Sequence, residues 1–219
     1  MKQTIADIMH IEDCTGCGSC KNICPKDAID LLNDKEGFLK YNVNLERCIR
    51  CGKCVNACPV LNPEYRNSQN PECYAIWAQD DIRLKSSSGG MFSLLANYIL
   101  KQNGYVAGVV FDRNFEVKHI LSSEINEIEQ MRKSKYYQSN TGFIFRDIKK
   151  ILLNEEKKKV LFTGTPCQVA GLYKFLGKNY KNLYTAEIIC HGITSKKVFD
   201  KYCSDMFQDK VIKSIAFRE

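Results

Sequence analysis

The chain has 219 residues, 44% of them hydrophobic, and a formal net charge of +7. This length suits one small module and one ordinary domain, but not two full-sized domains. No apolar run approaches the roughly 18 residues that cross a bilayer, and no secretory leader is recognisable, so we expect a soluble, cytoplasmic protein. The basic residues are not interleaved with stacking aromatics, which argues against a nucleic-acid surface.

Twelve cysteines without an export signal indicate metal ligands or reactive thiols rather than disulfides. Eight of them form two runs of the pattern C-x₂-C-x₂-C-x₃-C-P, which end at Pro25 and Pro59. This is the spacing of bacterial ferredoxins, in which three cysteines of a run hold one [4Fe–4S] cluster and the fourth reaches the other. The sequence therefore predicts one cluster on Cys14, Cys17, Cys20 and Cys58, and a second on Cys48, Cys51, Cys54 and Cys24.

Zinc is the alternative metal for such cysteines. Zinc sites usually combine two C-x₂-C pairs and often include histidine. Two matched sets of four cysteines, with the three histidines elsewhere, favour iron–sulfur clusters. Between the runs, residues 28–32 and 38–43 are predicted to form a hairpin, so that residues 1–62 make a two-cluster ferredoxin module.

Residues 63–72 are rich in proline and asparagine and are predicted to be a linker. Beyond it the pattern is that of a mixed α/β domain over residues 73–219. The predicted strands are 73–79, 105–111, 115–121, 159–163, 183–189 and 212–217. The predicted helices are 91–102, 124–131, 143–153, a segment from the turn at 164–168 to residue 176, and 195–206. The expected fold class is α+β, a small ferredoxin module followed by a mixed α/β domain.

Two turns in this domain could bind phosphate. Ser88-Gly89-Gly90 precedes a predicted helix, and Gly164-Thr165-Pro166 joins a strand to a helix. Free backbone N–H groups at a helix N-terminus attract anions. Neither turn matches the Rossmann or P-loop pattern, and each taken alone is better explained as an ordinary helix cap.

Four short motifs, taken in order behind a two-cluster ferredoxin, are more specific. They are SSSGG at 86–90, KYYQS at 135–139, GTPCQ at 164–168 and CHG at 190–192. This combination resembles the coenzyme F420 hydrogenase/dehydrogenase beta-subunit family over essentially the whole chain. The resemblance implies a non-Rossmann domain that binds FAD and passes electrons between a two-electron carrier and iron–sulfur clusters. The implied partners are a soluble redox carrier and an electron-transfer protein. A chlorophyll-derivative reductase of plants belongs to the same family, so the resemblance does not specify the electron donor.

The resemblance also suggests individual site residues. Those implied for the flavin are Ser88, Gly89, Gly90, Lys135, Tyr136, Gln138, Thr165 and Pro166. Cys167 and Cys190 correspond to ligands of a further [4Fe–4S] cluster, and His191 to a proton donor beside the flavin or a histidine that stabilises a loop. The C-x₂-C pair expected to complete that cluster does not occur before Arg218-Glu219. We therefore expect an incomplete flavin domain, and structural burial for Cys73 and Cys203.

The sequence is consistent with two functions. The first is an iron–sulfur flavoprotein oxidoreductase component that relays electrons between FAD and two clusters. The second is a non-enzymatic electron-transfer module whose α/β part is a flavin-free docking domain. An iron–sulfur regulator that binds nucleic acid is less favoured, because the sequence offers no nucleic-acid surface.

Overall fold

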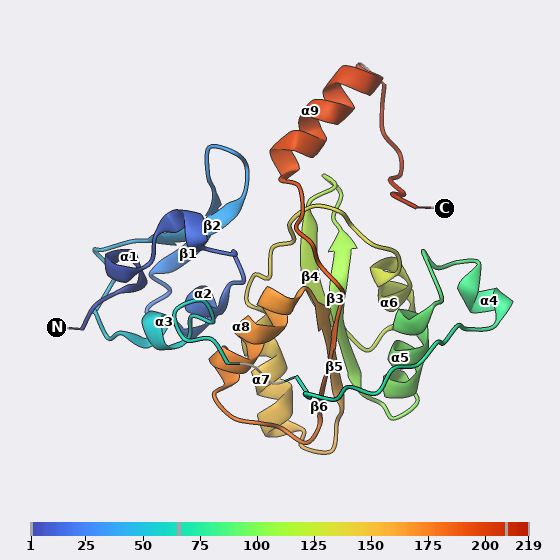
Figure 1. The fold of residues 1–219 in the computed structure, drawn as a ribbon, viewed down its shortest axis with the longest axis horizontal. Helices are drawn as coiled ribbons and strands as arrows, with labels where there is room; N and C mark the ends of the chain where they lie inside the picture. The colour runs from blue at the N-terminus through green and yellow to red at the C-terminus, as the bar shows by residue number, and fades with distance from the viewer. Residues whose placement is uncertain (1, 65–66, 209, 219) are drawn as a thin grey trace.

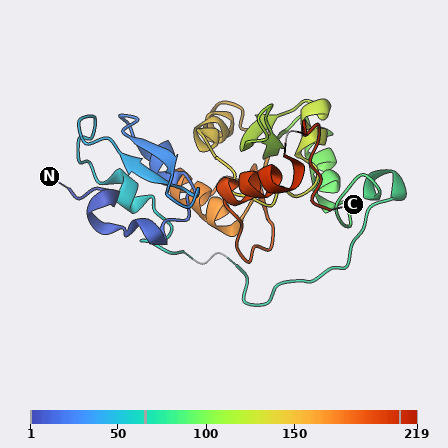
Figure 2. The same cartoon turned by 90° about the horizontal axis from the view of Figure 1, so that it is seen from above.

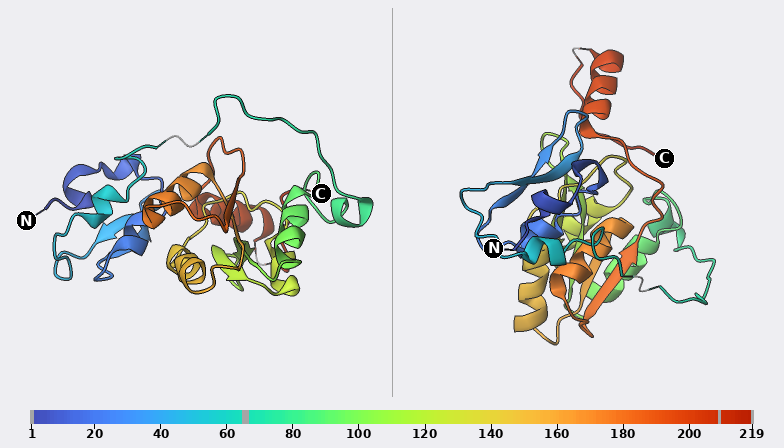
Figure 3. Two further views of the ribbon diagram at one scale, coloured as in Figure 1. Left: turned by 90° about the horizontal axis from the view of Figure 1, so that it is seen from below. Right: turned by 60° about the vertical axis from the view of Figure 1, so that its left-hand side comes forward.

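The computed structural model describes residues 2–64, 67–208 and 210–218. It consists of a small N-terminal module that lies beside a layered α/β domain (Figure 1). Residues 67–79, which we call the strap, run as a long extended segment along the outside of the molecule (Figures 2 and 3). Residues 65–66, inside the predicted linker, lie outside the described ranges, and the described part of 63–72 contains no helix or strand.

The N-terminal module wraps short helices around one hairpin. Its strands pair antiparallel, with Ile29 opposite Val43, which confirms the predicted hairpin. Gly18 and Gly52 precede two of the helices with φ of 80° and 75°, a conformation that glycine adopts without strain. The elements are α1 (Ile5–Ile8), the 3₁₀ turn η1 (Ile11–Asp13), α2 (Ser19–Ile23), β1 (Ile29–Asn33), β2 (Leu39–Val43) and α3 (Lys53–Asn56).

The α/β domain is built on a four-stranded sheet of order β4-β3-β5-β6. Strands β3, β5 and β6 are parallel, and β4 is antiparallel to β3. Its strands are β3 (Tyr105–Phe111), β4 (Val117–Ser122), β5 (Val160–Gly164) and β6 (Leu183–Glu187). Its helices are α4 (Asp80–Arg83), α5 (Met91–Leu100), α6 (Ile125–Met131), α7 (Ile144–Asn154), α8 (Pro166–Leu176) and α9 (Lys196–Phe207).

Successive strand residues point to opposite faces of the sheet, and each face has its own core. Ala107 and Phe162 pack with residues of α7 and α8. Val106 and Leu161 pack with residues of α5 and α6 on the other face. The domain therefore has three layers, and the N-terminal module lies on the outer side of the α7–α8 layer (Figure 1).

Most predicted elements are confirmed with small shifts at their ends, but two predicted strands are wrong. Residues 73–79 belong to the strap; Tyr74 is 73% exposed and Trp77 is 68% exposed. Residues 212–217 also form no strand. Their content of Ile212, Ile215 and Phe217 favours a strand, but no neighbouring strand edge accepts their backbone hydrogen bonds.

Helix α9 stands off the end of the α/β domain in the right-hand view of Figure 3, and none of its residues is buried. Among the described residues, no helix combines the length and apolar character needed to cross a membrane.

Candidate metal centre and its surroundings

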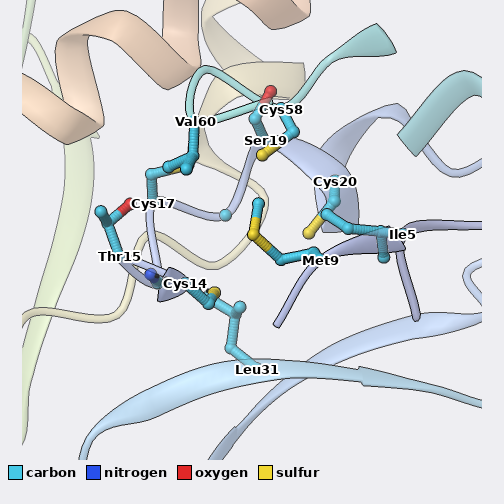
Figure 4. Close-up of a pocket in the computed structure, with 12 residues that line it drawn as sticks. Ile5, Met9, Cys14, Thr15, Cys17, Ser19, Cys20, Leu31, Cys58 and Val60 are labelled. Carbon is cyan, nitrogen blue, oxygen red and sulfur yellow. Dashed lines mark hydrogen bonds between the residues drawn. The ribbon is translucent and has the colours of Figure 1, made fainter. Parts of the chain in front are cut away.

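The N-terminal module has a partly open hollow that four thiols line (Figure 4). The thiols are those of Cys14, Cys17, Cys20 and Cys58. Its apolar walls come from Ile5, Met9, Leu31 and Val60. We call this the inner hollow.

A second partly open hollow lies in the same module, and we call it the outer hollow. Its four thiols are those of Cys24, Cys48, Cys51 and Cys54. Thr4, Lys26, Ile49 and Lys53 are among its other lining residues.

Each hollow thus combines three thiols of one cysteine run with the last thiol of the other. Helix α2 explains how, because it carries Cys20 at the inner hollow and ends at its C-cap, Cys24, at the outer one. The two groups of four are the two sets that the spacing predicts. Within the described ranges, no three His, Cys, Asp or Glu side chains are placed to share a single metal ion. The thiols instead surround a space, which fits a multi-iron cluster better than one zinc ion.

The buried thiols need a positive partner to ionise. Burial raises the pKa of Cys17 to about 12 and raises that of Cys20 well above its ordinary value. Backbone N–H groups point at three other sulfurs: Ile5 N lies 3.3 Å from Cys54 Sγ, Gly16 N lies 3.4 Å from Cys14 Sγ, and Ala28 N lies 3.3 Å from Cys24 Sγ. Iron would supply the charge that holds the ligands as thiolates, and N–H···S bonds of this kind tune cluster potentials. The donor set therefore fits iron–sulfur clusters.

The inner hollow is the one that lies against the α/β domain. A Cβ atom on Gly171 of α8 would lie only 3.0 Å from Cys17 Sγ. The Thr141 hydroxyl donates to the Cys17 carbonyl at 3.3 Å. The sequence analysis missed both contacts, because neither residue belongs to a cysteine run.

Arg146 of α7 makes the other main link between the two parts. Its Nε donates to Asn22 O at 2.7 Å, and its Nη2 donates to Cys24 O at 2.7 Å. The same guanidinium forms an ion pair with Asp27 at 2.7 Å. Arg146 therefore satisfies carbonyls at the end of α2, beside a thiol of the outer hollow. The sequence pattern around Arg146 indicates only an amphipathic helix, so it does not predict these contacts with the N-terminal module.

The loops implied for flavin binding gather at one edge of the sheet. Gly90 is the N-cap of α5, Thr165 is the N-cap of α8, and Cys190 follows β6. Because β5 and β6 are parallel, Thr165 and Cys190 both lie beyond the carboxyl ends of these strands, where α/β proteins usually bind ligands.

The loop at residues 133–140 touches each of its neighbours at this edge. Ser134 N donates to Ser87 Oγ at 3.4 Å, Gln168 Nε2 donates to Ser139 Oγ at 2.9 Å, and Thr194 Oγ1 donates to Tyr136 O at 3.0 Å. The motifs that are separate in the sequence are therefore adjacent in the structure.

Several implied flavin residues also have internal partners. Lys135 Nζ donates to the carbonyls of Gln130, Arg132 and Lys133 at the end of α6, and burial lowers its pKa to about 8. Gln138 lies between the two parts of the protein, accepting from Leu39 N and donating to Thr15 O at 3.2 Å. The exposed residues of the set are Ser88, Tyr136, Pro166 and His191.

Cys167 is coupled electrostatically both to Cys190 and to Cys17 of the inner hollow. Burial is the main cause of its raised pKa, to which the charge of Cys190 also contributes. Cys167 in turn raises the pKa of Cys17. The expected burial of Cys73 is wrong, since this residue is exposed on the strap, whereas Cys203 on α9 is half-buried.

Family models match most of the chain. Residues 13–62 match a 4Fe-4S dicluster domain, residues 73–144 match the N-terminal model of the coenzyme F420 hydrogenase/dehydrogenase beta subunit, and residues 157–218 match its C-terminal model. The chain belongs to the coenzyme F420 hydrogenase/dehydrogenase beta-subunit family. The dicluster domain near the N-terminus of this chain supports two [4Fe–4S] clusters and a role in electron transfer.

A similar solved structure is a chain of the F420-reducing [NiFe] hydrogenase complex from Methanosarcina barkeri. It is 19% identical with a TM-score of 0.46, and the match covers 59% of this chain and 47% of that chain. The chain thus spans less than half the length of this relative. No curated protein matches it.

Proposed function

We propose that this beta-subunit relative is an iron–sulfur flavoprotein component that relays electrons between FAD and a protein partner. The observation that carries the proposal is the pair of hollows, each surrounded by four thiols drawn from both cysteine runs. We assign the inner cluster to Cys14, Cys17, Cys20 and Cys58, and the outer cluster to Cys24, Cys48, Cys51 and Cys54.

The positions of the two hollows support one order of electron transfer. Cys17 of the inner hollow contacts Thr141 and lies against Gly171, both in the α/β domain. Lys26, Ile49 and Lys53 at the outer hollow are exposed on the surface of the module. Electrons would therefore pass between the α/β domain and the inner cluster, then the outer cluster, then the partner, in either direction.

FAD would exchange the two electrons of a hydride for single electrons that the clusters can carry. Gly90 offers no side-chain cap to α5, so the N–H groups of the first turn can face an anionic pyrophosphate. In this proposal Ser88 and Gly89 line that turn, Lys135 and Tyr136 form the adjacent wall, and Thr165 and Pro166 shape the start of α8. His191 is exposed at the same edge and would deliver a proton.

The alternative is an electron-transfer module with a flavin-free docking domain. It is favoured by the internal contacts of Lys135 and Gln138, which already use their polar groups. The flavoprotein proposal includes a third cluster that binds Cys167 and Cys190. Its remaining ligands would be other residues. A soluble carrier of electron pairs and a cytoplasmic location are likewise parts of that proposal.

Anaerobic purification with iron, sulfide and flavin quantitation tests both functions. We expect about eight irons per chain from the two cubanes, and about four more where the third cluster forms, together with flavin absorption bands and a fluorescent cofactor released on denaturation. Cys17→Ser should lower the iron content, whereas the matched variant Cys73→Ser, at an exposed cysteine on the strap, should leave it unchanged. Zinc in place of iron would contradict the proposal, and iron without flavin would select the flavin-free alternative.

A further inference from the structure

Charge is distributed unevenly around the two hollows. Among the described residues, no charged side chain lines the inner hollow, whereas Lys26 and Lys53 line the outer one. Two further basic residues lie beside it. Lys2 packs over Gly52, a lining residue, and Arg47 precedes the ligand candidate Cys48 in the chain. All four basic side chains are exposed.

The nearby carboxylates are mostly neutralised by other cations. Asp7 pairs with Arg50 at 3.2 Å, and Asp30 pairs with Lys21 at 3.1 Å. Asp27 pairs with Arg146 at 2.7 Å.

Within residues 2–64, 67–208 and 210–218, none of the recorded ion pairs involves Lys2, Lys26, Arg47 or Lys53. Glu46 is the exposed carboxylate next to Arg47. The face around the outer hollow thus keeps an excess of positive charge.

The face around the outer hollow also has exposed apolar residues at its centre, and two of its thiols are partly exposed. Ile49, which lines the outer hollow, is 56% exposed, and the nearby Leu45 is 61% exposed. Cys48 and Cys51 are half-buried, whereas Cys17, Cys20 and Cys58 of the inner hollow are buried. Exposed apolar groups inside a charged rim are typical of protein interfaces.

We propose that this face, defined by Lys2, Lys26, Arg47 and Lys53 around Ile49, docks an acidic one-electron carrier protein of the ferredoxin type. The inference rests on the proposed function. One electron passes between the outer cluster and the carrier, so that one centre is oxidised as the other is reduced, and no bond or proton is exchanged. The positive rim steers a negative partner into an orientation in which the two centres face each other.

The test uses the full cluster-loaded chain and an acidic bacterial ferredoxin as the probe, with the dissociation constant measured at low and at physiological salt. The variant Lys26→Glu/Lys53→Glu reverses two charges at the proposed face. The matched control Lys157→Glu/Lys181→Glu makes the same change in net charge on exposed lysines of the loops before β5 and β6. We expect the first variant to bind about tenfold more weakly and to lose salt sensitivity, with a change below about twofold in the control.

Iron content and the visible spectrum show whether each variant keeps its clusters. If Lys26→Glu/Lys53→Glu loses iron, the milder Lys26→Gln/Lys53→Gln and the single variant Arg47→Glu give the same comparison. The inference would be overturned if both charge-reversal variants weakened ferredoxin binding equally or if neither weakened it. It would also be overturned if the wild type did not bind the ferredoxin. Salt-sensitive binding of a DNA duplex at this face, with no ferredoxin binding, would also overturn it. Absence of iron from the wild-type chain would instead refute the proposed function, so the two failures are distinguishable.

Discussion

Gly171 shows how one residue controls the contact between the two parts of the molecule. A Cβ atom at this position would lie 3.0 Å from Cys17 Sγ and 3.2 Å from Cys17 Cβ. Cys17 is buried, and its carbonyl accepts a hydrogen bond from Thr141 Oγ1 at 3.3 Å, so it has little space to move away. A side chain at 171 would therefore push against a proposed cluster ligand.

We expect Gly171→Val to loosen the inner cluster. The bulky side chain must displace either Cys17 or the whole N-terminal module, at a cost of about 1–3 kcal/mol for overpacking. Iron per chain and the rate of iron loss to a chelator measure the effect. The control is Ala170→Val, the same new side chain at the preceding, half-buried position of α8. Equal iron retention in both variants would contradict the proposed role of Gly171.

His119 is a buried base, and it makes stability depend on pH. Its ring stacks on Phe162, Nε2 lies 3.3 Å from Thr163 O, and burial lowers its pKa to about 4. In the unfolded chain its pKa is near the ordinary 6.5. Between these values the unfolded chain binds more protons, so stability falls as pH drops from about 6.5 to 4 and is not changed further by His119 below that.

We predict that wild type loses up to about 3 kcal/mol more than His119→Gln over this pH interval. Urea unfolding of both proteins at pH 7 and pH 4.5 gives the comparison, and the difference between them cancels the acid sensitivity that the clusters contribute to both. Parallel pH profiles for the two proteins would show that His119 does not titrate in this way.

At the scale of elements, α2 is the structural link between both hollows and the α/β domain. A helix of five residues does not hold itself together, because nucleation is unfavourable and few hydrogen bonds follow it. Arg146 stabilises its C-terminal end through Asn22 O and Cys24 O. The α7 helix therefore acts as a support for the cysteine that crosses to the outer hollow.

Replacing Arg146 by methionine should weaken the outer cluster more than the inner one. Loss of charged hydrogen bonds to carbonyls at a partly buried interface costs about 2–3 kcal/mol. Chelator-induced iron loss and the electron paramagnetic resonance of the reduced clusters report the change. The matched control is Lys150→Met on the same helix, whose exposed pair with Asp147 contributes about 1 kcal/mol or less. The idea fails if both variants release iron at the wild-type rate.

The strap shows where a pattern of side chains misleads. Residues 73–79 form a short apolar run with the aromatic and β-branched residues typical of a strand, yet the main-chain bond that fixes their end is Ala78 N to Gly89 O at 2.7 Å. A strand also needs a free edge beside it, and this depends on the arrangement of the whole sheet. The hairpin of β1 and β2 was predictable because both partners and their turn are contiguous in the sequence.

At the scale of the whole molecule, the two parts are stabilised in different ways. The α/β domain has apolar cores on both faces of its sheet. The small core of the N-terminal module combines three buried cysteines with Ile5, Met9, Ile29 and Tyr41. Metal ligation should therefore supply much of the folding free energy of the module.

Removing iron should unfold the module while the α/β domain stays folded. Hydrogen exchange after anaerobic chelation should show lost protection over α1 to α3 and retained protection in β3 and β5. Far-UV circular dichroism should show a partial loss of signal, which iron and sulfide reconstitution restores. Full protection of the module without iron would contradict this prediction, as would cooperative unfolding of the whole chain.

The chain by itself determined the two sets of four thiols, since the spacing within a cysteine run leaves its last thiol too far along to join the other three. Its short motifs also indicated the family and the order of most helices and strands. Tertiary structure alone decided that the inner hollow faces Gly171 and Thr141, and that Arg146 holds the end of α2. These contacts join residues more than 120 positions apart, and local periodicity carries no information about which distant surfaces meet.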